Sequence, residues 1–232
     1  MEPNTLTIAH RGASAYAAEN TVQSFQKAVE LRADYVELDA RQTKDGKIIV
    51  FHDEAIGGMP VKNQNCRDIL LRGKSHGIDI PLLADIIKMF KNTIGLNIEI
   101  KGDMDIDLLM DIAQHGKNKG LLFSSFNRNC LERLKNAYPG VKTGLLLNDA
   151  PTDLFKVLGR LNADALILKH YRLKRVVPEK AGEKGVKTIV WTVNNVKDMK
   201  KYIKWGVWGI ITDYPDKLHK LKRTMGKGKN ED

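Results

Sequence analysis

Short runs of apolar residues alternate along the chain with longer segments in which apolar residues recur every three or four positions. The short runs predict strands, because four to eight apolar residues bounded by turn residues are typical of a buried strand. The longer segments predict amphipathic helices. The strands of this repeating pattern start at residues 6, 35, 96, 121, 143, 165, 187 and 208. The helices are predicted at 21–31, 82–91, 105–118, 128–137, 153–161, 175–184 and 197–204.

The alternation of strands and helices predicts the fold class. Strands that alternate regularly with helices indicate an α/β fold with a parallel sheet covered by helices. The eight strands are the number that closes a (β/α)₈ barrel. A doubly wound open sheet is the alternative, but no glycine-rich dinucleotide fingerprint follows the first strand. We therefore expect one barrel domain over residues 1–221.

Residues 47–52 predict an additional strand outside this alternation. They follow the turn signal Lys44-Asp45-Gly46 directly, and a parallel partner would need a crossover of about a dozen residues or more. We therefore expect an antiparallel hairpin with residues 35–41, in which His52 lies roughly opposite Glu37. Residues 53–81 lack clear periodicity, so they predict an irregular insertion with one helical turn near Cys66–Leu71.

Composition and charge narrow the possible partners. The 232 residues carry a net charge of +10, and 42% of them are hydrophobic, which is typical of a globular protein. Most of the basic excess lies in residues 169–204 and 217–229, without a nucleic-acid reading motif or interleaved aromatics. We therefore expect solvated helix faces, no specific nucleic-acid site and a disordered basic tail at 222–232. The oligomeric state stays open.

Cysteine usage and hydropathy suggest a compartment. Cys66 and Cys130 are the only cysteines, too few for a disulfide framework or a cysteine metal cluster. The chain shows neither a signal-peptide pattern nor a run of about 18 apolar residues that could span a membrane. We expect a soluble, reduced protein of the cytoplasm.

The ends of the predicted strands carry a set of charged residues. In a barrel of this kind the chemistry lies at the C-terminal ends of the strands. The residues concerned are His10, Glu37, Asp39, Glu99 and Lys101. Three converging carboxylates would repel one another unless a cation lay between them, and oxygen ligands suit Mg²⁺ or Ca²⁺. The alternative is that they pair with Arg11, Arg41 and Lys101 without a metal, and spacing alone does not separate the two.

The histidines at two of these ends also allow two interpretations. A single histidine at a strand end is more often structural than catalytic. His10 and His52 together flank the carboxylate cluster, however, and imidazole titrates near neutral pH, which suits general acid–base catalysis. Arg11 offers a planar guanidinium for a phosphate or a carboxylate.

These motifs together resemble a known family. His10-Arg11-Gly12 followed by Glu19-Asn20-Thr21 resembles the opening signature of the glycerophosphodiester phosphodiesterases. The next signature is matched by Glu37-Leu38-Asp39, by residues 43–46 and by His52-Asp53. Further matches are Glu99-Ile100-Lys101, Ser125-Phe126, residues 191–194 and residues 209–213. The resemblance extends from about Ile8 to Leu218.

The resemblance implies a TIM-barrel hydrolase that splits a glycerophosphodiester, such as glycerophosphocholine or glycerophosphoethanolamine, into a glycerol phosphate and an alcohol. By position, the matching residues are Glu37, Asp39 and Glu99 as ligands of Mg²⁺ or Ca²⁺, His10 and His52 as the acid–base pair, Arg11 and Lys101 as phosphate contacts, and Phe126 and Trp191 as pocket walls. Within the pair we assign His10 as the base and His52 as the acid.

The departures from the family pattern concern substrate choice. Ala18 stands where the family usually has proline, residues 54–59 replace a usual motif, and Pro81-Leu82-Leu83 replaces a Pro-Thr-Leu pattern. We expect all of them to lie in or beside the insertion, which in the family normally covers the glycerol end of the substrate. One rival interpretation is a lysophospholipase D-like or other lipid phosphodiesterase on the same barrel. Another is a non-catalytic anion-binding module, which the loss of a histidine or a ligand carboxylate would favour.

Overall fold

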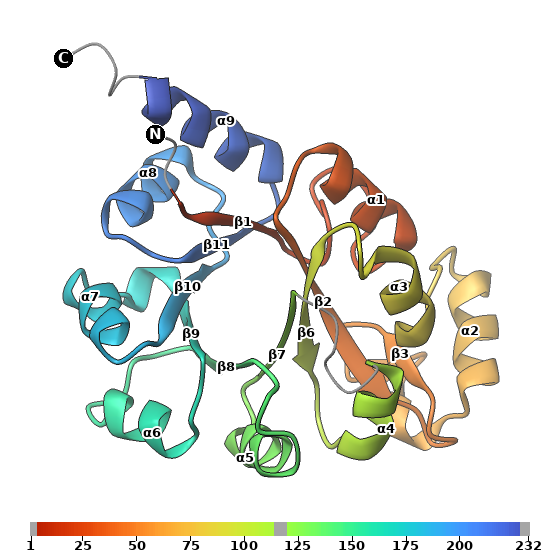
Figure 1. The fold of residues 1–232 in the computed structure, drawn as a ribbon. Coiled ribbons are helices and arrows are strands. Elements are labelled where there is room, and N and C mark those ends of the chain that lie inside the picture. Colours follow the sequence, from red (N-terminus) through yellow and green to blue (C-terminus); the bar gives the residue numbers. More distant parts are fainter. Residues whose placement is uncertain (1–3, 114–119, 228–232) are drawn as a thin grey trace.

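The computed structural model describes residues 4–113 and 120–227, and their main feature is a closed barrel of parallel strands (Figure 1). The strands are β1 (Leu6–Ala9), β2 (Tyr35–Gln42), β6 (Gly95–Ile100), β7 (Leu121–Ser125), β8 (Thr143–Leu147), β9 (Ala165–Lys169), β10 (Lys187–Trp191) and β11 (Gly209–Thr212). They pair in the order β1-β11-β10-β9-β8-β7-β6-β2, and β2 pairs with β1. That closing pair confirms the (β/α)₈ barrel and excludes the open sheet.

Helices surround the barrel, and of those that alternate with the parallel strands all but the last were predicted. They are α1 (Val22–Glu30), α3 (Leu83–Phe90), α4 (Ile106–Ile112), α5 (Arg128–Ala137), α6 (Leu154–Arg160), α7 (Val176–Glu183), α8 (Val196–Lys204) and α9 (Pro215–Lys227). The prediction for 105–118 extends into residues 114–119, which lie outside the described part. None of the described helices combines the length and the apolar character needed to cross a membrane.

Helix α9 corrects one prediction from the sequence. Residues 222–227, predicted as part of a disordered tail, are the last turns of this helix, while 228–232 lie outside the described residues. Leu218 is fully buried, and Leu221 and Met225 pack against the same core cluster. Their spacing of three and four residues is helical, and the lysines between them masked it in the sequence.

The predicted hairpin is present. Strand β3 (Ile48–Val50) runs antiparallel to β2, with Ala40 opposite Val50 and Gln42 opposite Ile48. Extending this register places His52 opposite Leu38, one residue from the predicted partner. The hairpin is also shorter than expected, since regular pairing stops at Val50.

The insertion after the hairpin is more regular than its sequence suggested. It contains β4 (Ala55–Ile56), β5 (Met59–Pro60), a 3₁₀ turn at Val61–Asn63 and helix α2 (Cys66–Ser75). Helix α2 therefore replaces the single turn predicted near Cys66–Leu71. Only a narrow stripe of it is buried, against a small cluster that includes Ile49, Ile56 and Ile80, so its helical period was weak.

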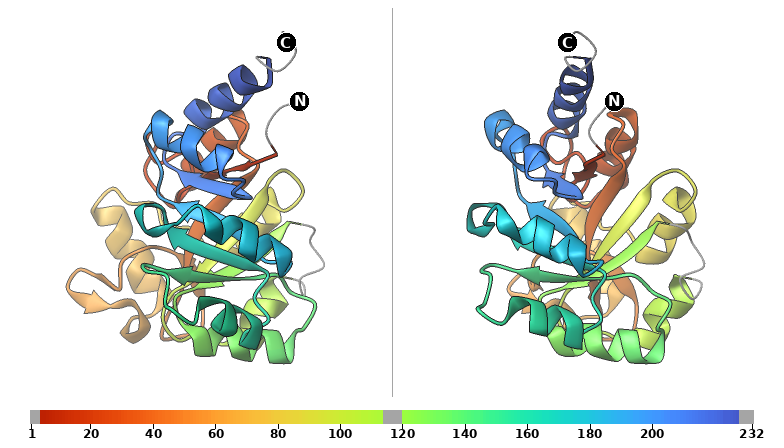
Figure 2. Two further views of the ribbon diagram at one scale, coloured as in Figure 1. Left: turned by 90° about the vertical axis from the view of Figure 1, so that its left-hand side faces the viewer. Right: turned by 60° about the vertical axis from the view of Figure 1, so that its left-hand side comes forward.

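The barrel interior is filled with apolar side chains from the strands. Ile8, Leu122, Leu146, Ile167, Ile189 and Ile211 form one buried cluster. In the two side views the helices lie around the strands (Figure 2). Because the interior is filled, a functional site can form only where the strands end.

Candidate active site

The three predicted metal ligands lie together at the ends of two neighbouring strands. Asp39 on β2 is directly opposite Glu99 on β6, and Glu37 is two residues before Asp39 on the same face. One carboxylate oxygen from each of the three lies within 4.8 Å of the others. All three residues are buried, with at most 7% of their surface exposed. Such a cluster needs a source of positive charge.

The pKa values of the three acids show how the cluster shares its charge. Burial, and then the charge of Asp39, raises the pKa of Glu37 to about 8. Burial also raises the pKa of Glu99, with Lys101 opposing it. Burial acts upward on the pKa of Asp39 as well, but Lys101, Asn20 and Arg11 outweigh it and lower that pKa. Asp39 therefore holds its charge most firmly.

Two cations, Lys101 and Arg11, contact the carboxylate cluster. These two contacts, and a third from Arg41, were expected from the metal-free interpretation of the sequence. The Lys101 ammonium lies 3.1 Å from Asp39 Oδ1 and 2.5 Å from Glu99 Oε1. Arg11 Nε lies 3.3 Å from Asp39 Oδ2. Arg41 behaves differently from that expectation, because its Nε and Nη2 donate hydrogen bonds of 2.9 and 2.8 Å to the backbone carbonyl of His52.

The oxygen atoms of the cluster also fit a divalent cation. Asp39 Oδ1 and Glu99 Oε1 are buried and accept no hydrogen bond from the described residues, although both are close to the Lys101 charge. Glu37 Oε2 accepts a hydrogen bond of 2.9 Å from the backbone N–H of Arg11. A site of carboxylate oxygens suits a hard ion, whose positive charge would oppose the burial and the Asp39 repulsion that raise the pKa of Glu37.

His10 follows β1 and is held by a polar network. Its Nδ1 lies 2.7 Å from Asp213 Oδ1, and that carboxylate also accepts hydrogen bonds from Ser14 Oγ and Asn194 Nδ2. Burial lowers the pKa of His10, but Asp213 and Glu37 outweigh it, so the net shift is upward. Asp213 and Asn194 belong to motifs that match the family, but no role was predicted for them from the sequence. The spacing of the motifs does not show that Asp213 contacts His10.

His52 lies on the loop after β3 and is less enclosed. Its Nδ1 contacts Asp53 Oδ1 at 2.8 Å. The side chains of the two residues are 36% and 71% exposed. Its backbone is fixed by Arg41, as described above.

A cavity of about 130 Å³ joins these groups. Of the nine residues predicted for the site, the cavity is lined by His10, Arg11, Glu37, His52, Glu99, Lys101, Phe126 and Trp191. The ninth, Asp39, is 1% exposed and lies within the carboxylate cluster. The rings of Phe126 and Trp191 meet edge to face with centroids 5.7 Å apart. The fold thus brings all nine together.

Two further polar residues in the cavity were missed from the sequence. Asn97 Oδ1 and Ser124 Oγ are buried and have no hydrogen-bond partner among the described residues. Asn97 is two residues before Glu99 on β6, and Ser124 pairs with Glu99 from β7. The period of two on β6 could have indicated Asn97, whereas Ser124 requires the strand register.

The loop after β1 brings Asn20 to the carboxylates. The backbone turns sharply, with positive φ at Arg11, Gly12 and Asn20. A Cβ atom on Gly12 would lie 2.3 Å from Ser24 Oγ, so no side chain fits there. Asn20 Nδ2 then donates to Asp39 Oδ2 at 2.8 Å, and Thr21, next in sequence, caps α1.

Comparison with known proteins assigns the family. Residues 10–217 match the family model described as the glycerophosphoryl diester phosphodiesterase family. The chain belongs to this family. One relative is the glycerophosphodiester phosphodiesterase of Caldanaerobacter subterraneus subsp. tengcongensis. It is 33% identical over 241 residues, and the match covers 96% of this chain and 99% of that protein. The putative glycerophosphodiester phosphodiesterase YhdW of Bacillus subtilis is 32% identical, covering 90% and 94%.

Solved structures of the glycerophosphoryl diester phosphodiesterase family share the fold. A glycerophosphodiester phosphodiesterase from Thermotoga maritima superposes with a TM-score of 0.82 and 28% identity, covering 94% of this chain and 98% of that one. An Oleispira antarctica phosphodiesterase, solved in complex with the product sn-glycerol-3-phosphate, gives a TM-score of 0.85 at 24% identity, covering 93% and 96%.

Proposed function

We propose that this chain hydrolyses glycerophosphodiesters to glycerol phosphate and an alcohol, as a metal-dependent phosphoric diester hydrolase. The observation that carries the proposal is the cavity in which two histidines, two cations and an acidic cluster meet at the strand ends. The names of the relatives support it, and so does the sn-glycerol-3-phosphate product bound to the Oleispira enzyme. Small deacylated phospholipids such as glycerophosphocholine are the substrates that we expect.

The first task of the site is to neutralise the phosphodiester. Its negative charge repels nucleophiles, and more charge accumulates as the transition state forms. Arg11 and Lys101 line the cavity and would contact the phosphoryl oxygens. Glu37, Asp39 and Glu99 would hold one Mg²⁺ or Ca²⁺. When bound, this ion supplies Lewis-acid polarisation of a phosphoryl oxygen.

The two histidines would transfer the protons. His10 would act as the base, since Asp213 at Nδ1 leaves Nε2 available for the proton of the attacking hydroxyl group. The upward shift of its pKa makes it a stronger base. His52 would protonate the leaving alkoxide from the more exposed side of the cavity, where a released alcohol can diffuse away.

The release of glycerol phosphate from glycerophosphocholine tests the function directly. We expect turnover in Mg²⁺ or Ca²⁺, loss in EDTA and recovery when one of the ions returns. Glu37→Gln should weaken metal binding measured by calorimetry, because it removes a ligand charge. No turnover, or turnover that EDTA leaves unchanged, would contradict the proposal. Lysophosphatidylcholine belongs in the same assay because a rat lysophospholipase D is 23% identical over 270 residues.

We also propose that the protein acts in the cytoplasm. Cys66 and Cys130 are both free and buried, which is usual in a reducing compartment. Fractionation of cells that produce the protein, followed by immunoblotting, tests this. Recovery of the protein mainly in the extracellular or membrane fraction would contradict it.

A further inference from the structure

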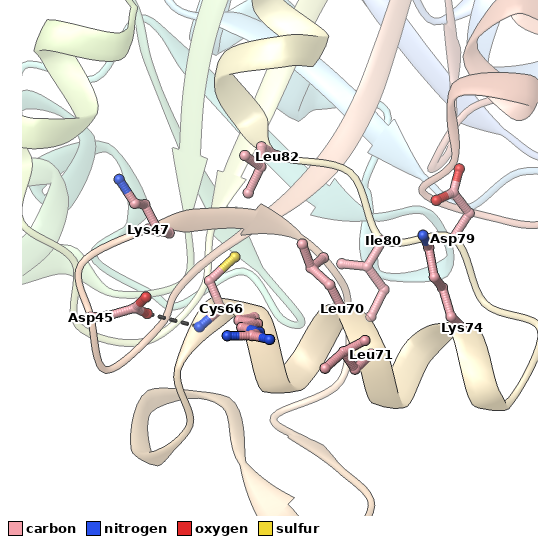
Figure 3. Close-up of a pocket in the computed structure, with 10 residues that line it drawn as sticks. Asp45, Lys47, Cys66, Leu70, Leu71, Lys74, Asp79, Ile80 and Leu82 are labelled. Carbon is pink, nitrogen blue, oxygen red and sulfur yellow. Dashed lines mark hydrogen bonds between the residues drawn. The ribbon is translucent and has the colours of Figure 1, made fainter.

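A second cavity lies in the insertion, between the β2–β3 hairpin and helix α2 (Figure 3). Its volume is about 510 Å³, and none of the nine residues predicted for the catalytic site lines it. Binding sites for small molecules typically have about 300–1,000 Å³. The cavity, called here the α2 groove, is therefore large enough for a ligand of its own.

The floor of the α2 groove is apolar. Leu70, Ile80 and Leu82 point into the space between β3 and α2 in Figure 3, and Cys66 directs its sulfur toward the same space. Leu71, which is 58% exposed, adds an apolar side chain at the open side of the groove. From Cys66 to Leu71, the apolar lining residues of α2 rise about 7.5 Å at 1.5 Å per residue. The apolar strip therefore has room for a large part of a single alkyl chain.

The two ends of the α2 groove carry charges of both signs. Lys47 and Arg67 line it near the start of α2. Lys74 lines it at the other end, near Asp79 in Figure 3. The carboxylate of Asp45 is engaged, because it accepts hydrogen bonds of 2.6 Å from Thr43 Oγ1 and 2.8 Å from the N–H of Cys66. These hydrogen bonds keep Asp45 in its charged form, so Lys47 and Arg67 together leave one net positive charge near the start of α2 for an anion.

We propose that the α2 groove binds a single-chain anionic amphiphile. Its alkyl chain would lie along Leu70, Ile80 and Leu82, and its carboxylate or phosphate would contact Lys47 and Arg67. Fatty acids and lysophospholipids with an anionic head group share this chemistry. The fatty acids follow from the proposed reaction, because the deacylation that forms a glycerophosphodiester releases them.

The α2 groove lies close to the active site. Asp79 and Ile80 line the groove and also a neighbouring cavity of about 260 Å³. That neighbouring cavity includes His52 and Asp53. Asp79 and Ile80 would therefore separate a ligand in the groove from the cavity beside the loop that carries His52, the proposed general acid.

Calorimetric titration with three twelve-carbon probes below their micelle concentrations tests the proposal. Dodecanoate and 1-lauroyl lysophosphatidate should bind, and dodecyltrimethylammonium should bind at least about tenfold more weakly, because only its charge is wrong. The stronger of the two anionic probes identifies the source of the ligand. No binding of either anion, or equal binding of the cation, would overturn the proposal.

Variants locate the binding. Arg67→Glu, on the exposed face of α2, should weaken dodecanoate binding at least about tenfold, and Leu71→Gln should weaken it severalfold. The matched controls are Lys88→Glu and Met89→Gln on α3, which replace an exposed cation and an exposed apolar residue outside the groove and should leave affinity unchanged. Circular dichroism and turnover of glycerophosphocholine should be unaffected in all four. Equal losses in the controls would contradict the site.

The two cysteines provide an independent footprint. Dodecanoate should slow the alkylation of Cys66, which lines the α2 groove, and leave the rate at Cys130 unchanged. Mass spectrometry of the alkylated peptides measures both rates in one sample. Binding without protection of Cys66 would place the ligand elsewhere and overturn the proposal. Because no probe is a substrate of the proposed hydrolysis, this outcome would leave the proposed function intact.

Discussion

The two histidines of the active site are supported by different parts of the molecule. His10 follows β1, which pairs with β11, and its backbone N–H donates to the carbonyl of Thr212. Its ring contacts Asp213, which is itself held by Ser14 and Asn194. His52 lies on the hairpin added to the outside of β2, and its partner Asp53 is 71% exposed.

The structure therefore fixes the orientation of the His10 ring, whereas it leaves the His52 ring accessible to solvent. A network with several fixed hydrogen bonds holds a ring in one tautomer and one direction, which a base needs before the substrate arrives. A partner in solvent fixes the ring less firmly but leaves room for an alcohol to depart. We therefore expect the chain to depend more on the support of His10 than on that of His52.

The largest effects should follow removal of either ring. His10→Ala and His52→Ala should each lower kcat about 10²–10⁴-fold, the usual contribution of an acid–base group. Metal content and circular dichroism should be unchanged. A p-nitrophenyl phosphodiester, whose leaving group needs no proton, should partly rescue His52→Ala and not His10→Ala. Rescue of both variants, or of neither, would contradict the division of roles.

The next effect should follow a change in the support of His10. Asp213→Asn places an amide that can donate to Nδ1, which favours the tautomer with the proton on Nε2, so the ring can no longer act as a base. We expect kcat to fall about 10²-fold or more, by analogy with the serine protease triad. Asp53→Asn is the matched variant on the other side and should cost only a few-fold. Equal losses in steady-state assays would remove the contrast between the two regions.

A smaller effect should follow the loss of Arg41. This residue holds the His52 backbone through two hydrogen bonds to one carbonyl, so Arg41→Gln should let the loop shift. A misplaced catalytic group reduces rate sharply, and we expect kcat to fall about tenfold with KM changed much less. Arg41→Lys, which can restore one hydrogen bond, should recover part of the rate. A change confined to KM would show that Arg41 acts on substrate binding instead.

Much of the barrel could be predicted from the sequence, because its information is local. Each strand is a short buried run, and each helix has an apolar face, so the starts of all eight parallel strands were predicted to within one residue. Helix α9 and the full length of α2 escaped because each buries only a narrow stripe among charged residues. Periodicity is a weak signal where burial is slight.

The site was predictable only in part, for a related reason. Glu37, Asp39 and Glu99 stand at strand ends, where topology alone brings them together. The partners of the histidines depend on contacts across the closed barrel, and Asp213 is 203 residues from His10 in sequence. The direction of Arg41 likewise depends on where the loop after β3 passes, which spacing does not determine.

The smallest effect should appear in stability against pH, measured in EDTA. The pKa of Asp213 is lowered in the folded state, because its hydrogen bonds to His10 and Asn194 outweigh burial. Its contribution to the stability of the fold is therefore present above the unfolded pKa near 3.8, and is lost as the pH falls through the folded pKa. The pKa of His10 is raised, so its contribution is present below 6.5 and is lost as the pH rises through the folded value. Asp213→Asn should therefore lower the melting temperature most between these limits. The loss in free energy of unfolding should be no more than about 1 kcal/mol, because the pair is partly exposed. Asp53→Asn provides the comparison, and we expect a smaller difference because its pair is more exposed. A loss in Asp213→Asn that stays constant from pH 3 to pH 9 would show that the pair orients His10 without an ionic contribution.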